Sequence, residues 1–188
     1  LRLRDVTIHA LDGVFHGAVD INKYEHFRAN GVLNDLSLVS LSRAAGLRNA
    51  NFRGKISGPA EITGRLGNGL HDTKVAGHFQ IAAQQGGVPA QGAVEVAWDQ
   101  RTNTVQLGPS QIALPHTRVN VQGTLGQTLT VRMESTDLNE LKPAIEMATD
   151  KPAEELPIVL APNGSVVFDG TVAGPMTSPA INGQVVIT

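Results

Sequence analysis

Apolar and polar residues alternate along most of this chain. A period of two residues places successive side chains on opposite faces of a β-strand. The alternation therefore predicts about twelve strands of ordinary length, each with one apolar face and one polar face. The clearest alternating runs begin at Val6, Phe52, Val75, Val94, Val119, Leu129, Val166 and Ile181.

Short turn signals separate these runs. The pairs Asn30–Gly31, Asn68–Gly69 and Asn163–Gly164 tolerate positive φ and favour hairpin turns. Asn182–Gly183 falls inside an alternating run, where a glycine is typical of a bulge or a close backbone approach. Gly108-Pro109-Ser110 also predicts a turn. Turns at intervals of about 8–12 residues favour an antiparallel meander over βαβ units.

Two segments have apolar residues at helical spacing instead. Residues 35–45 predict a short helix that ends at Gly46, and residues 137–148 predict a second one. Asp137 is a suitable N-cap, and Glu140 stands three residues later at the spacing of a capping box. Pro143 predicts that this second helix begins or kinks there. Residues 151–157 are expected to be a linker.

The chain also contains an approximate internal repeat. Asp35-Leu36 resembles Asp137-Leu138, and Gly54–Pro59 resembles Gly170–Pro175. Each unit would consist of several strands, a short helix and a strand with the pattern Gly-x-x-x-Gly-Pro. We therefore expect a single segment over residues 1–188, with approximate repeats over 1–66 and 72–188.

Composition excludes several classes of protein. The 188 residues contain 15 lysines and arginines against 17 acidic residues, so the formal charge is −2. This balance argues against nucleic acid as a partner and against a surface that holds anionic headgroups by charge. The absence of cysteine excludes disulfides and thiolate chemistry. No apolar run is long enough for a transmembrane helix. Because the chain starts at Leu1 without a signal peptide, we interpret it as a segment of a longer protein.

The sequence carries no recognisable catalytic or metal-binding motif. Its six histidines show no His-x-His, His-x-x-x-His or His-Glu-x-x-His spacing, so we expect surface histidines and no metal. There is no Gly-x-Ser-x-Gly motif. Gly64, Gly67 and Gly69 lack the Gly-Lys-Ser/Thr that holds phosphate, and a hairpin explains them better. We therefore predict a protein that is not an enzyme and has no cofactor.

The apolar faces of the strands need a cover or an occupant. Two short helices cannot cover about twelve strands, so either the sheet folds onto itself or an apolar groove stays open. Each buried methylene is worth about 0.8 kcal/mol, so phospholipid acyl chains suit such a groove. The same residues would line the dry core of a closed sandwich. The candidate lining residues are Val75, Phe79, Ile81, Val94, Val96, Trp98, Val119, Val121, Leu129, Val131, Met133, Val166 and Phe168.

Part of the sequence resembles a known family. Gly170–Gly174 and Pro179–Ile187 are similar to the repeating pattern of the TamB family, the inner-membrane-anchored subunits of the translocation and assembly module of diderm bacteria. Leu129–Met133 followed by Asp137–Pro143 resembles a strand of that family followed by its Asp-Leu-x-x-Leu-x-Pro turn. The related AsmA-like proteins share much of this pattern.

The resemblance implies an all-β fold and a role in the cell envelope. The expected fold is an elongated antiparallel sheet, curled into an open U-shaped (taco-like) groove with one or two short helices. Its apolar groove would carry phospholipid acyl chains between the inner and outer membranes, or support outer-membrane protein assembly. The segment would lie in the periplasm as an internal part of an inner-membrane-anchored protein. An outer-membrane barrel resembling TamA would contact other parts of that protein.

Two other functions fit the same pattern. A closed β-sandwich or β-solenoid would be a structural or adhesion module without lipid. A carbohydrate-active β-helix would need acidic residues clustered on one ladder, and none is visible. The lipid-groove interpretation and the closed-sandwich interpretation differ in whether the apolar face of the sheet is open.

Overall fold

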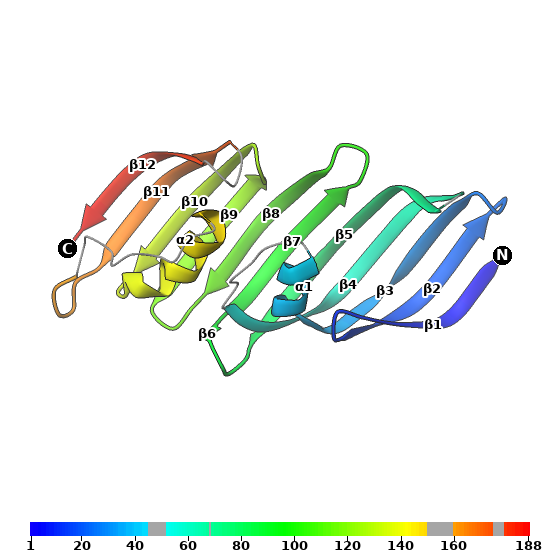
Figure 1. The fold of residues 1–188 in the computed structure, drawn as a ribbon, viewed down its shortest axis with the longest axis horizontal. Coiled ribbons are helices and arrows are strands. Elements are labelled where there is room, and N and C mark those ends of the chain that lie inside the picture. The colour runs from blue at the N-terminus through cyan, green and yellow to red at the C-terminus, as the bar shows by residue number, and fades with distance from the viewer. Residues whose placement is uncertain (45–51, 68, 150–159, 175–178) are drawn as a thin grey trace.

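The computed structural model describes residues 1–44, 52–67, 69–149, 160–174 and 179–188, which form one sheet and two short helical segments on one side of it (Figure 1). The helical segments are α1 (Leu38–Ala44), followed further along the chain by the 3-10 helix η1 (Leu138–Leu141) and by α2 (Lys142–Thr149). The strands are β1 (Arg2–Ala10), β2 (Gly13–Asn22), β3 (His26–Ser37), β4 (Phe52–Gly67), β5 (Gly69–Ala83), β6 (Val88–Pro89), β7 (Gln91–Asp99), β8 (Thr104–Ala113), β9 (Thr117–Thr124), β10 (Thr128–Ser135), β11 (Val166–Ala173) and β12 (Ala180–Ile187).

The sheet is an antiparallel meander. Its main path runs β1-β2-β3-β4-β5-β7-β8-β9-β10-β11-β12, so every strand of this path pairs with its neighbours in the chain. Among the described strands only β6 lies off the path, and it pairs with the start of β4 in parallel. The sheet does not close on itself, because β1 and β12 are edge strands at opposite ends (Figure 1). The predicted all-β fold with an open, curled sheet is confirmed, and a two-sheet sandwich is not formed.

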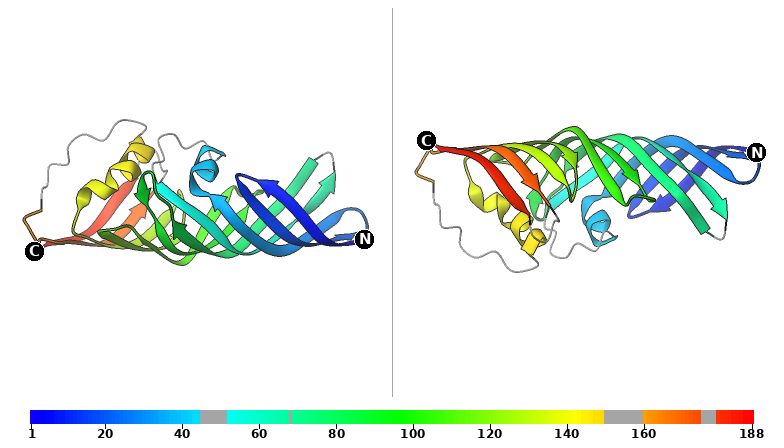
Figure 2. Two further views of the ribbon diagram at one scale, coloured as in Figure 1. Left: turned by 90° about the horizontal axis from the view of Figure 1, so that it is seen from below. Right: turned by 90° about the horizontal axis from the view of Figure 1, so that it is seen from above.

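Both helical segments are excursions from the sheet. The chain leaves after β3 to form α1 and returns as β4, which pairs directly with β3. It leaves again after β10 to form η1 and α2 and returns as β11, which pairs with β10. Figure 2 shows α1 and α2 on the same side of the curled sheet. The meander therefore continues past both helices without a change of order.

Two of the predicted turns are wrong. Asn30–Gly31 lies in the middle of β3, where Gly31 faces Gly17 of β2. A Cβ on Gly31 would lie 2.2 Å from the carbonyl oxygen of His16, so this glycine permits close strand approach rather than a turn. The predicted turn at residues 108–110 lies within β8, at a shift of the β8–β9 register between Leu107 and Ser110. This bulge accommodates a proline inside a strand.

The other glycine signals agree with the structure. Gly67 and Gly69 pair at the end of the β4–β5 hairpin, and Asn68 between them lies outside the described residues. The Gly164 N–H donates to the carbonyl of Ala161 at 2.8 Å and closes a turn before β11. Gly183 faces Gly170 with the close backbone approach expected at this position. The predicted linker over residues 151–157 lies outside the described residues.

The helices differ from the expected ones in their first residues. Helix α1 begins at Leu38, because residues 35–37 continue β3. Asp137 is the N-cap of η1, and its carboxylate accepts from the Asn139 N–H at 3.0 Å. The predicted capping box is wrong, since the Glu140 carboxylate accepts from the backbone N–H of His116 instead. Pro143 is the second residue of α2, a position that tolerates proline in the first turn of a helix.

Candidate functional site

Strand register gives the sheet one apolar face and one polar face. Residues paired directly across an antiparallel ladder point to the same side of the sheet. Val75 pairs with Trp98, and Val121 pairs with Val131. Continued from strand to strand, such pairs extend over the whole meander. We call this side the apolar face. It is the side on which α1 packs, because Leu38 of α1 lies against Gly54 of β4.

All thirteen predicted lining residues lie on the apolar face. In the C-terminal half, Val119 pairs with Met133, and Met133 pairs with Phe168. In the central strands, Phe79 pairs with Val94. The remaining members, which join these pairs in the same rows, are Ile81, Val96, Leu129 and Val166. The sequence-based selection therefore collects residues that the fold brings together from five strands, β5, β7, β9, β10 and β11.

Sequence reasoning missed the part of this face that lies on the other strands. The register adds apolar residues on β1–β4, β8 and β12, and one more residue on β11. The signal that identifies those on β1, β4 and β12 is the same alternation of apolar and polar residues in the sequence. The additional residues of the apolar face include Phe15, Val19, Ala29, Leu33, Ile56, Ile62, Val105, Leu107, Ile112, Val172, Ile181 and Val185.

Helix α1 covers only a small part of the apolar face. Leu36, Ile56 and Ile81 form a buried cluster, and Leu33, Leu38, Phe79 and Val94 pack around it. Elsewhere the apolar side chains of the inner strands are mostly half-buried by one another. The large exposed apolar residues include Ile8 on β1 and Ile181, Val185 and Ile187 on β12. Within the described residues, the buried apolar cluster therefore lies beside α1, and the other buried apolar residues, Phe15, Ala29, Ala90 and Val166, lie outside it.

The exposed area of the chain agrees with an open sheet. A compact protein of 19.8 kDa exposes about 8,600 Å². This chain exposes 11697 Å². Along the main path of the sheet, strands about 4.8 Å apart give the apolar face a length of about 48 Å. One leaflet of a bilayer is about 15 Å of hydrocarbon, so this face is about three acyl chains long.

Phenylalanine rings and glycines shape the floor of the apolar face. The ring of Phe15 lies over Gly31 of the neighbouring strand, and the ring of Phe168 lies over Gly170 and Gly183. A Cβ added at Gly170 would lie 2.8 Å from the Phe168 ring and 2.2 Å from the carbonyl of Asn182. Glycines thus leave room for flat rings. The apolar face is therefore flat where these rings lie over glycines.

The second helical segment is tied to the sheet by a buried carboxylate. Both oxygens of Glu140 lie 3.0 Å from the backbone nitrogen of His116, in the β8–β9 turn. The Nδ1 atom of His116 lies 2.9 Å from the same carboxylate. The Glu140 side chain is only 9% exposed. This contact fixes η1, from which α2 continues on the side of the apolar face (Figure 2).

The opposite face of the sheet is polar and charged. Arg28 pairs with Glu61 at 2.8 Å, Lys74 with Asp99 at 3.0 Å, and Arg132 with Asp169 at 3.5 Å. The hydrogen bond from Lys74 lowers the pKa of Asp99 below its ordinary value. These pairs are solvent-exposed, so each contributes little to stability. Their effect is to keep this face hydrated while the other is apolar.

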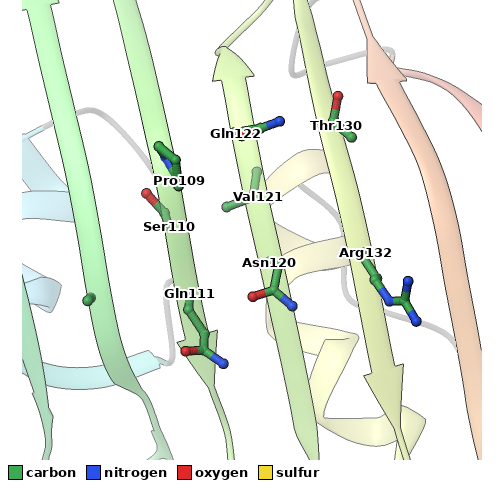
Figure 3. Close-up of a pocket in the computed structure, with 9 residues that line it drawn as sticks. Pro109, Ser110, Gln111, Asn120, Val121, Gln122, Thr130 and Arg132 are labelled. Atoms are coloured by element: carbon green, nitrogen blue, oxygen red, sulfur yellow. The ribbon is translucent and has the colours of Figure 1, made fainter.

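A shallow hollow of about 490 Å³ lies on the polar face (Figure 3). Gln111, Asn120, Gln122, Thr130 and Arg132 line it from three adjacent strands. Their amide, hydroxyl and guanidinium groups offer hydrogen bonds to water or to polar molecules. The hollow is therefore unsuited to an acyl chain, and it contains no predicted lining residue except Val121.

All six histidines are exposed, as the sequence predicted. Within the described residues, no group of three or more histidine, aspartate or glutamate side chains is placed to hold a metal ion. None of the helices in the described ranges is long and apolar enough to cross a membrane.

Comparison with known proteins adds no identification. No protein-family model, no curated protein and no solved structure matches this chain. The resemblance to the TamB family stays a prediction from the sequence.

Proposed function

We propose that the apolar face binds phospholipid acyl chains and that the chain is a non-enzymatic segment of a lipid conduit in the bacterial envelope. The observation that carries this proposal is the open apolar face, which is continuous over the strands of a single sheet and which, among the described residues, is covered only locally, by α1 and at η1 and α2. An exposed apolar surface of this extent marks a binding surface in a soluble protein. The opposite, charged face keeps the other side of the sheet hydrated.

The chemistry of the face suits passage of lipid rather than tight capture. Aliphatic side chains contact methylene groups without direction, at about 0.8 kcal/mol for each methylene buried. The rows of such residues repeat from strand to strand at about 4.8 Å, so an acyl chain finds similar contacts at each position. Such binding does not require a deep pocket on the apolar face. Because the contacts are similar at each position, an acyl chain can move along the face.

The wider role follows from the resemblance to the TamB family and to AsmA-like proteins. We propose that the segment lies in the periplasm as part of an inner-membrane-anchored protein, and that it conveys phospholipid between the inner and outer membranes. A partner similar to the TamA barrel would act through other parts of the full-length protein. Support for outer-membrane protein assembly is the second role that the same resemblance suggests.

Lipid extraction from the purified chain tests the proposal. Mass spectrometry of the extract should find phospholipid in near-stoichiometric amount with the natively folded chain. Val121→Asp and Val131→Asp each place a charge on the apolar face and should lose that lipid. Thr130→Asp on the polar face of the same strand is the matched control and should retain it.

A lipid-free chain would contradict the proposal, provided that its circular dichroism shows an intact sheet. In that case the sheet would be a structural or adhesion module, the alternative that the sequence left open. Loss of lipid in Thr130→Asp as well would show that the bound lipid is not held by the apolar face.

A further inference from the structure

The ends of the strands form two long margins of the sheet, and these margins differ. At one margin the chain leaves β3 for α1 and leaves β10 for η1 and α2. Both helical segments start there on the side of the apolar face, so we call it the helical margin (Figure 2). At the opposite margin, short turns over residues 23–25, 100–103 and 125–127 join successive strands (Figure 1). We call it the hairpin margin, and no described connection there contains a helix.

The burial of large apolar side chains decreases from the helical margin to the hairpin margin. Within the described residues, the large apolar side chains that are buried all lie toward the helical margin, and they are Phe15, Leu36, Ile56, Ile81 and Val166. Near the hairpin margin, Val75 and Trp98 are only half-buried. A phospholipid has a similar gradient, because its acyl chains are apolar while its ester and phosphate groups are polar. The gradient therefore favours one orientation of a bound lipid over the reverse.

One buried polar atom near the hairpin margin has no partner. Thr73 of β5 is 8% exposed, and its Oγ1 atom makes no hydrogen bond within the described part of the chain. Its backbone is held by the β7–β8 turn, since its N–H donates to the Gln100 side chain at 3.0 Å and its carbonyl accepts from the Gln100 N–H at 2.8 Å. A buried hydroxyl without a partner lowers stability, so a bound molecule that satisfies it gains affinity.

Thr73 lies on the apolar face, beside the single tryptophan. Val75 follows it by two residues on β5, on the same face, and pairs with Trp98. The same row of β5 reaches Ile81 after a further six residues, so Thr73 and Ile81 are about 26 Å apart along the strand. An acyl chain of about 15 Å fits between Thr73 and the buried cluster at α1 without displacing the helix.

We propose that a phospholipid lies along the strands of the apolar face, with its ester end at the hairpin margin and the methyl ends of its acyl chains toward the helical margin. The inference rests on the proposed function. The Thr73 hydroxyl donates to an ester carbonyl of the lipid, and the headgroup projects past the short turns into water. Binding requires a change of the Thr73 χ1 rotamer or a shift of neighbouring side chains, because the hydroxyl is buried in the lipid-free chain. One neutral hydrogen bond orients the lipid without trapping it.

Brominated phosphatidylcholine, added to the lipid-free chain, tests the orientation. Lipid brominated near the ester should quench Trp98 fluorescence more strongly than lipid brominated near the methyl end. The double variant Trp98→Phe with Phe79→Trp moves the indole about 13 Å toward the helical margin and should show the opposite order. Equal quenching by the two lipids, or the reverse order in the wild type, would overturn the orientation. Absence of quenching by either lipid in either protein would overturn the proposed function as well.

Thr73→Val tests the hydrogen bond, since valine has nearly the same shape without the hydroxyl. The affinity for phosphatidylcholine brominated near the ester, titrated through Trp98 quenching, should fall about five-fold. Thr73→Ser keeps the hydroxyl and should bind as the wild type does. The lipid-free Thr73→Val chain should be at least as stable as the wild type, because a buried hydroxyl without a partner has been removed.

A matched control separates the Thr73 hydroxyl from general effects of the substitution. Thr63 of β4 pairs with Lys74 on the polar face, so Thr63→Val should leave the affinity unchanged. Unchanged affinity in Thr73→Val, or an equal loss in Thr73→Ser or in Thr63→Val, would overturn the role of Thr73 while leaving acyl-chain binding intact. Circular dichroism of each variant checks that the sheet is retained.

Discussion

The carboxylate of Glu140 accepts the backbone N–H of His116, with both oxygens 3.0 Å from that nitrogen. The two residues lie 24 positions apart, one in η1 and the other in the β8–β9 turn. A glutamate this deeply buried is rare unless hydrogen bonds satisfy its charge. The contact joins η1 to the sheet, and its removal should lower the free energy of unfolding.

Glu140→Ala should lower the free energy of unfolding by about 2–3 kcal/mol, because hydrogen bonds to a charged acceptor are lost and the His116 N–H is left without its acceptor. Urea unfolding followed by circular dichroism measures this change. Glu134→Ala, on an exposed position of β10, is the control and should cost less than about 0.5 kcal/mol. Equal losses in the two variants would show that the contact does not stabilise the fold.

Asp137 should give the stability of the η1 region a dependence on acidic pH. Its pKa is lowered chiefly by the hydrogen bond from the Asn139 backbone N–H, with a further one from the Asn139 side chain. A lowered folded pKa means that the carboxylate stabilises the fold above its unfolded value of about 3.9, and that this contribution is lost as pH falls through the folded pKa.

Asp137→Asn tests this dependence, because asparagine is also a good N-cap but does not titrate. Between about pH 6 and pH 2, the midpoint temperature of thermal unfolding should fall less steeply in the variant than in the wild type. Asp137→Ala should cost about 1 kcal/mol at neutral pH through loss of the cap. Identical pH profiles for wild type and Asp137→Asn would contradict the prediction.

Gly170→Ala should destabilise the C-terminal strands. The new Cβ would lie 2.2 Å from the Asn182 carbonyl oxygen and 2.6 Å from the Gly183 Cα, and neither backbone atom can move away easily. Overpacking of this kind costs about 1–3 kcal/mol. Gly67→Ala is the comparison, since the nearest atom to its Cβ lies 3.5 Å away in the His71 side chain. Chemical denaturation of both variants should show a clear loss only in Gly170→Ala.

Trp98 should report an acyl chain on the apolar face. It is the single tryptophan, and it lies on that face between Val75 of β5 and Val105 of β8. Phospholipid with brominated acyl chains should quench its fluorescence. In the double variant Trp98→Phe with Gln106→Trp, the indole lies on the polar face, and the quenching should disappear. Equal quenching of both proteins would argue against binding on the apolar face.

Alternation in the sequence was sufficient to predict the sheet and the faces of its strands, but it left open whether the sheet closes on itself, and the open form was expected only from the resemblance to the TamB family. Alternation succeeded because side chains of period two, such as Val119, Val121 and Gly123, have only two faces to choose from. The order of the strands was also predictable, since in an antiparallel meander the neighbours in space are neighbours in the chain.

The errors came from residues whose roles depend on distant parts of the chain. The pair Asn30–Gly31 has the composition of a turn, but Gly31 is required by the approach of Gly17 and the ring of Phe15. Glu140 has capping-box spacing, but its partner His116 lies in another turn. Neither partner can be found by local propensity, because tertiary contacts override it.

The order of the strands also determines how the chain loses its structure. Each strand depends mainly on the two strands beside it, so the sheet behaves as a row of linked hairpins rather than as one indivisible core. Under tension applied to its termini, such a row should yield from the edges inward, one hairpin after another. Strands near α1 would be the last to separate, because the buried cluster of Leu36, Ile56 and Ile81 joins β3, β4 and β5. The molecule would then resist extension gradually rather than rupture in a single event.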